Sequence, residues 1–66
     1  MPVTATVVNS RTGRVARRVC STAEEAAGSL AVLLRAAGWE RSQEETVALL
    51  LRRPITFNGF VYSVDS

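Results

Sequence analysis

Short alternations of apolar and polar residues near both ends of the chain flank two longer stretches with helical spacing. Residues 3–8 alternate valine or alanine with threonine, which predicts a strand with one apolar face. A turn rich in asparagine, serine and glycine follows at 9–13, and residues 14–20 are predicted to return as a second strand. The first third of the chain is therefore expected to form a β-hairpin.

The pattern changes to the helical period over residues 22–37. Ser21 and Thr22 are each followed three residues later by a glutamate, which is the spacing of a capping box. Gly38 is typical of the residue that follows a helix. At about 100° per residue, one apolar stripe centred on Leu30 is expected to face the core. This predicted stripe consists of Ala23, Ala26, Ala27, Leu30, Leu33, Leu34 and Ala37.

A second helix is predicted over residues 42–53. Ser42 begins it with another capping box, and Pro54 ends it. We expect Trp39, in the connector, to fill the corner between the two helices. The predicted inner stripe of the second helix consists of Val47, Leu50 and Leu51.

Residues 55–64 have the composition of a strand, but the apolar positions change phase at Asn58-Gly59. Two structures explain this change. One is a tight hairpin with a type I′ turn, and the other is a single strand with a bulge at Gly59. We favour the bulged strand, because Ile55 to Phe57 is short for a strand of its own.

These elements predict one α+β domain over residues 1–66, in the order ββααβ. A helical hairpin is expected to cover one face of a small antiparallel sheet. The expected strands are 3–8 and 14–20, which form the hairpin, and the C-terminal strand 55–64; the expected helices are 22–37 and 42–53.

The composition argues against an enzyme. Histidine, the usual general base near neutral pH, is absent, and so is lysine. Cys20 is the only cysteine, and one thiol without any histidine cannot supply the ligands of a zinc site. We expect Cys20 to be a small buried side chain instead. Capping and helix dipoles explain most of the six acidic residues. We therefore expect no catalytic residues, no cofactor and no metal.

The longest uninterrupted apolar stretches have five residues, against about 20 for a membrane span. The first residues also lack the basic and then apolar pattern of a secretion signal. We therefore expect a cytoplasmic protein without a membrane partner.

Half of the eight arginines lie within the first hairpin. They could contact phosphates or an acidic partner, or they could protect a solvated strand edge from pairing with other edges. The hypothesis of a nucleic-acid or acidic-partner contact names Arg11, Arg14, Arg17, Arg18, Arg52 and Arg53.

Each predicted helix also carries one apolar residue about 160° from its core stripe. These residues are Val32 and Leu49. Single exposed aliphatic side chains are ordinary, but one on each helix favours a protein contact. The predicted protein interface consists of Val32, Arg35 and Leu49.

The order of motifs resembles the NUMOD1 type of small modular helix-turn-helix domain, which accompanies homing endonucleases of phages and mobile elements. Similar features are the glycine turn and strand at 13–15, the serine cap and helix start at 21–27, and the glycine-aromatic strand at 58–62. The resemblance implies DNA binding. However, the second helix begins with Glu44 and Glu45, where a recognition helix should be polar or cationic.

The sequence thus predicts a small non-enzymatic binding protein, encoded by a phage or mobile element. The acidic start of the second helix and the net charge of only +2 favour protein–protein contact, as an inhibitor, an adaptor or a homodimer. The alternative is a small nucleic-acid-binding regulator that uses the arginine-rich hairpin.

Overall fold

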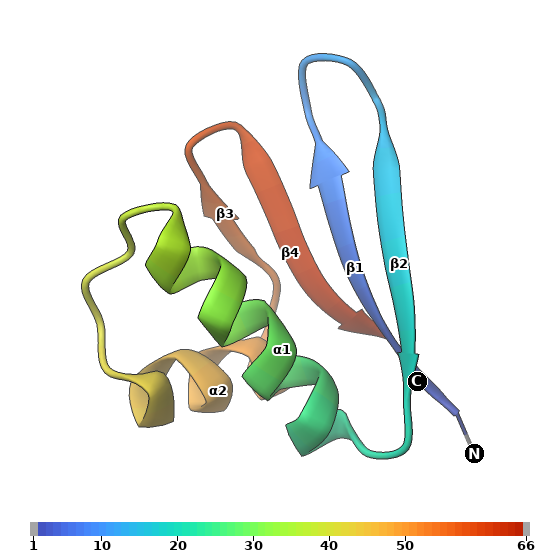
Figure 1. Cartoon of the computed structure of the whole chain (residues 1–66), viewed down its shortest axis with the longest axis vertical. Coiled ribbons are helices and arrows are strands. Elements are labelled where there is room, and N and C mark those ends of the chain that lie inside the picture. The colour runs from blue at the N-terminus through green and yellow to red at the C-terminus, as the bar shows by residue number, and fades with distance from the viewer. Residues whose placement is uncertain (1, 66) are drawn as a thin grey trace.

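Residues 2–65, which the computed structural model describes, contain one four-stranded antiparallel sheet and two helices (Figure 1). The strands lie in the order β2-β1-β4-β3, so β2 and β3 are the two edges. The predicted α+β class is confirmed, with the element order ββααββ. The elements are β1 (Val3–Asn9), β2 (Val15–Cys20), α1 (Ala23–Ala36), α2 (Gln43–Arg52), β3 (Ile55–Phe57) and β4 (Phe60–Asp65).

The helix starts follow the predicted caps. The hydroxyl oxygen of Thr22 accepts a hydrogen bond from the Glu25 N–H at 3.1 Å, and that of Ser42 accepts one from the Glu45 N–H at 3.2 Å. These bonds satisfy N–H groups that have no partner within the first turn. Gly38, with a φ of 105°, follows α1 as predicted.

The C-terminal segment is a hairpin and not a single bulged strand, so the favoured prediction for 55–64 was wrong and its alternative is confirmed. Asn58 and Gly59 have φ values of 55° and 83°, as a type I′ turn requires at both central positions. The turn closes the pair Phe57↔Phe60 and brings Ile55 opposite Tyr62. The apolar phase changes because the chain reverses, and both halves keep the same face toward the helices.

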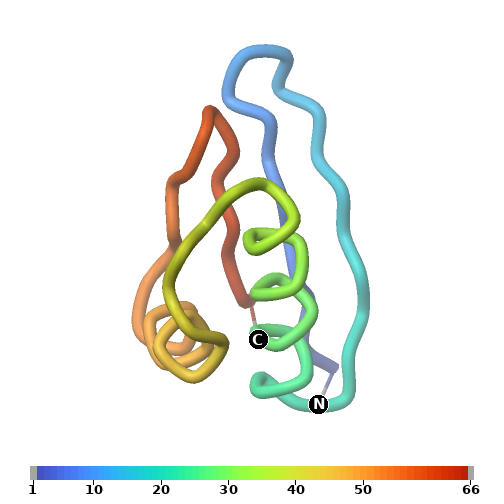
Figure 2. The backbone as a smooth tube through the Cα atoms, turned by 60° about the vertical axis from the view of Figure 1, so that its left-hand side comes forward, coloured from blue at the N-terminus to red at the C-terminus, as the bar shows by residue number. Residues whose placement is uncertain are grey.

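Both helices cover one face of the sheet (Figures 1 and 2). α1 packs mainly on β1 and β4 and more sparsely on β2, whereas α2 contacts α1 and β4. Between these layers lies one core. Its buried members are Val3, Ala5, Cys20, Ala26, Ala27, Leu30, Leu34, Leu50, Ile55 and Tyr62.

The buried side of α2 is rotated from the predicted stripe. Thr46 and Leu50 are buried, Val47 is half-buried, and Leu51 is 45% exposed. Thr46 tolerates burial because its hydroxyl donates to the Ser42 carbonyl and accepts from the indole N–H of Trp39, each at 2.8 Å. A hydropathy pattern contains no information about such hydrogen bonds, so it does not predict that Thr46 is buried.

Trp39 fills the expected corner and also reaches the sheet. Its ring meets that of Phe57 edge to face, with the ring centres 5.3 Å apart. The connector between the helices is thereby fixed to β3, the shorter of the two edge strands.

Candidate functional site

The edge strand β2 is the least covered element of the sheet. Five of its six residues are exposed, and only Cys20 at its end is buried. Ala16 and Arg18 lie on the same side of the strand as Cys20, yet both are exposed. α1 therefore covers only the last part of β2.

The outer side of β2 carries peptide groups that no strand in the described part of the chain pairs with. The register ends with Val8 opposite Val15, and just beyond it the Asn9 N–H donates to the Arg14 carbonyl at 2.8 Å. Because bonded and non-bonded pairs alternate in an antiparallel ladder, the peptide groups of Val15, Arg17 and Val19 point away from β1.

An open groove of about 310 Å³ separates β2 from α1. The strand lines it with Ala16, Arg17 and Arg18, the helix lines it with Val32 and Leu33 among others, and β1 forms its base. Among the residues described, none that lines this groove is acidic. The groove is therefore apolar with a basic side. We call the groove and the open edge of β2 together the β2–α1 surface.

Leu33 is the residue for which sequence and structure disagree most at this surface. The helical pattern predicted it, together with Ala37, in the core stripe, but Leu33 is 51% exposed and Ala37 is exposed as well. Ala31 is buried instead. The buried arc of α1 is shifted toward Ala31, so Leu33 stays exposed beside the groove that faces β2.

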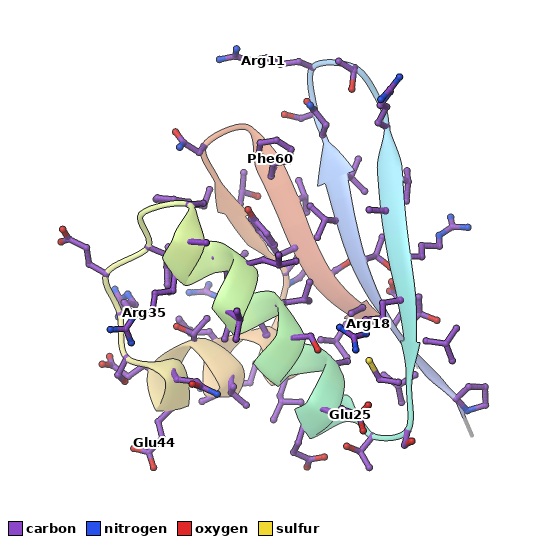
Figure 3. All side chains as sticks on the ribbon, in the orientation of Figure 1. Arg11, Arg18, Glu25, Arg35, Glu44 and Phe60 are labelled. Atoms are coloured by element: carbon purple, nitrogen blue, oxygen red, sulfur yellow. The ribbon has the colours of Figure 1, made fainter. Side chains whose placement is uncertain are left out.

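The four arginines of the first hairpin do not share one face. Arg17 pairs with Thr6 and lies on the open face of the sheet, whereas Arg18 pairs with Ala5 and lies on the helix side. Arg11 extends from the tip of the hairpin (Figure 3). Arg14, like Arg18, has the helix-side parity.

The tip of this hairpin is fixed to the second hairpin. The Ser10 N–H and hydroxyl both donate to the Gly59 carbonyl, at 2.9 and 2.7 Å. Gly13, with a φ of 75°, donates its N–H to the Asn9 carbonyl and closes the turn. The arginines are thus carried on a defined turn.

The remaining predicted site residues lie elsewhere. Arg52 and Arg53 lie at the end of α2, which is near the β3 edge of the sheet and away from β2 (Figure 1). Arg35 lies beside the connector that follows α1 (Figure 3). The six predicted arginines therefore do not form one surface.

The predicted exposure of Leu49 was wrong. Leu49 is half-buried and packs against the core, because the rotation of α2 that buries Thr46 also turns Leu49 inward. Val32, at 61% exposure, is the one member of the predicted protein interface that lies on the β2–α1 surface. Sequence reasoning missed Leu33, Val15 and Val19. The available signal was that residues 15–20 have no apolar face of their own.

The described residues offer little other chemistry. They contain no group of three acidic, cysteine or histidine side chains close enough to hold a metal ion. Burial raises the pKa of the Tyr62 hydroxyl above its ordinary value of 10.0. In residues 2–65, neither helix is long and apolar enough to cross a membrane.

Comparisons with protein-family models, with curated proteins and with solved structures found no match to this chain. The similarity to NUMOD1-type domains therefore stays a prediction.

Proposed function

We propose that this domain is a protein-binding module that receives its partner on the β2–α1 surface. The observation that carries the proposal is Leu33, which continues the apolar stripe of α1 but lies exposed beside an exposed strand. Val32 and Ala16 extend the apolar lining of the groove. Exposed apolar side chains in one groove mark contact surfaces more often than scattered ones do.

Other elements explain why the partner is expected here and not on α2. Leu51 on α2 is similarly exposed, at 45%. However, the strand that follows α2 is β3, which has only three residues and packs against Trp39 through Phe57. The β2–α1 surface combines apolar side chains with free backbone groups and positive charge. Protein partners can use all three.

Selection from a random peptide display library tests this proposal. The wild-type domain is the bait, Leu33→Asp is the test variant, and Leu51→Asp is the matched control. We expect selected peptides that bind the wild type and Leu51→Asp equally and lose at least about tenfold in affinity for Leu33→Asp. Circular dichroism checks that all three domains fold. Peptides that bind Leu33→Asp unchanged, or a library that yields no binders, would contradict the proposal.

Nucleic acid is the second candidate ligand. Residues 2–23 contain four arginines and no acidic residue, so the first hairpin carries a positive field. However, Arg17 and Arg18 lie on opposite faces, and a duplex that docks on one face would meet only some of these charges. A gel shift with mixed duplex DNA at about 50 mM salt tests this candidate, because phosphate contacts are strongest there. No shift would rule it out.

A further inference from the structure

We propose that β2 accepts an extended acidic segment of a partner protein as a fifth strand of the sheet. This inference rests on the proposed function and adds to it the binding mode and the chemistry of the partner. It predicts two neighbouring acidic residues in the segment, one for each face of the sheet, with apolar residues on both sides of them.

The outer edge of β2 has unpaired backbone groups within the described residues. Val15, Arg17 and Val19 present three N–H donors and three carbonyl acceptors along the outer edge. An extended segment can bond to all of them, as peptides do when they add a strand to an exposed edge. The edge is six residues long, whereas β3 at the other edge has three.

The side chains supply the partner's chemistry. On the open face Arg17 lies between Val15 and Val19, and on the groove face Arg18 follows Ala16. Directly opposite residues of neighbouring strands interact on the same face, and opposite charges are favourable there. Acidic side chains are therefore expected opposite Arg17 and Arg18, with small apolar ones opposite the residues that flank them.

The groove continues this surface beyond the strand. An added strand would turn its groove-side residues toward α1, where Val32 and Leu33 are exposed. Apolar residues at those positions would cover Leu33, which the domain alone leaves 51% exposed. One partner segment would thus both bond to the backbone of β2 and cover the exposed apolar side chains of α1.

A second copy of this chain is a poor occupant of the same edge. A two-fold pair of antiparallel β2 strands can be centred on Ala16, Arg17 or Arg18 with most of the strand paired. These registers place Arg14 opposite Arg18, Arg17 opposite its own mate, or Arg18 opposite its own mate. Like charges directly opposite one another are destabilising. The edge therefore resists self-pairing but remains open to an acidic strand.

Two synthetic peptides of equal composition test the inference. The matched peptide is Thr-Val-Glu-Glu-Val-Val-Thr, whose two glutamates lie on opposite faces of an extended chain. The control is Thr-Glu-Val-Glu-Val-Val-Thr, whose glutamates lie on one face and can meet only one of Arg17 and Arg18. Both carry Gly-Ser at each end and blocked termini, and binding to the full chain is followed by NMR titration.

We expect the matched peptide to bind about tenfold more tightly than the control, because it adds cross-strand charge and apolar pairs. At saturation, amide hydrogen exchange should slow at Val15, Arg17 and Val19, while the amides of Ala16 and Arg18 already bond to β1. Arg18→Glu should lose about tenfold in affinity for the matched peptide, whereas Arg53→Glu, with the same change in charge, should not.

Each other outcome overturns the inference. Equal affinity for both peptides, or binding without slowed exchange at the three edge amides, would show plain charge attraction. A short DNA duplex that displaces the matched peptide at the same salt would assign the hairpin to nucleic acid. If the library selection yields Leu33-dependent binders that are not acidic strands, this inference fails and the proposed function stands. If the selection yields no binders, the proposed function fails too.

Discussion

The two edge strands of the sheet show how one small domain closes one edge and leaves the other open. β3 has three residues, follows Pro54, and carries Ile55 in the core and Phe57 against Trp39. β2 is twice as long, and most of it is exposed on both faces. Short edges and covering side chains are common means of preventing edge pairing, and β3 uses both. β2 has arginines instead.

We expect the charge on β2 to act as a selective barrier to pairing. A short edge such as β3 offers few backbone groups to any strand, whereas an edge that carries Arg17 and Arg18 is expected to disfavour mainly strands with positive charge. Substitutions at both edges test whether the two edges differ in this way.

The largest expected effect is on stability at the closed edge. Ile55→Ala should lower the free energy of unfolding by about 2 to 4 kcal/mol, because it leaves a cavity in the core. Val19→Ala, at a residue 70% exposed on β2, should change it by less than about 0.5 kcal/mol. Urea denaturation measures both. Similar losses of stability at the two positions would mean that β3 is no more tightly packed than β2.

Removal of the charges should open β2 to self-pairing. Arg17→Thr combined with Arg18→Thr should self-associate at concentrations about tenfold lower than the wild type, because the like-charge contacts disappear. Light scattering over a concentration series measures the change. The pair Arg52→Thr and Arg53→Thr, at the end of α2, has the same net charge and should behave as the wild type. Equal behaviour of the two double variants would remove the role assigned to charge.

The cover over β3 depends partly on one hydrogen bond. Trp39→Phe removes the N–H that donates to the Thr46 hydroxyl and should cost about 1 kcal/mol. Trp39 is the only tryptophan, so unfolding is followed by circular dichroism. Thr46→Val alone and with Trp39→Phe completes a double-mutant cycle. A coupling near zero would show that the ring and not the bond holds the connector.

The smallest expected effect is a pH dependence of the closed half of the sheet. Because burial raises the pKa of Tyr62 in the folded state, that state holds the proton more tightly than the unfolded state does. This contribution is fully present below pH about 10 and is lost as the pH rises through the folded-state pKa. Denaturation between pH 9 and 11 should show the fall. Tyr62→Phe should show a flatter profile, and identical profiles would mean that Tyr62 does not contribute.

The local features of the fold could be predicted closely from the sequence. The helices begin at Thr22 and Ser42 because a hydroxyl followed three residues later by glutamate satisfies N–H groups of the first turn. Asn58-Gly59 gave two alternatives, since the same residues suit a type I′ turn and a bulge. Only the pairing of β3 with β4 decides between them.

The candidate site was predicted less well, because exposure depends on neighbours. Val32 was correctly placed on the outside, whereas the contacts expected of Arg17 and Arg18 stay predictions. Leu33 was assigned to the core because the pattern gives the apolar arc of a helix and not the width of the sheet beneath it. Leu49 was assigned to the surface because the pattern does not show how α2 is rotated against the core.

The sequence by itself determined where both helices and the first turn lie, because caps, glycines and the apolar period act within a few residues. It also determined that half of the arginines lie in one hairpin. Only the tertiary structure decided that this hairpin lies at the edge of the sheet and that α1 leans away from it toward α2. Strand order and helix position depend on contacts between residues far apart in the chain. Those contacts leave β2 open and Leu33 exposed.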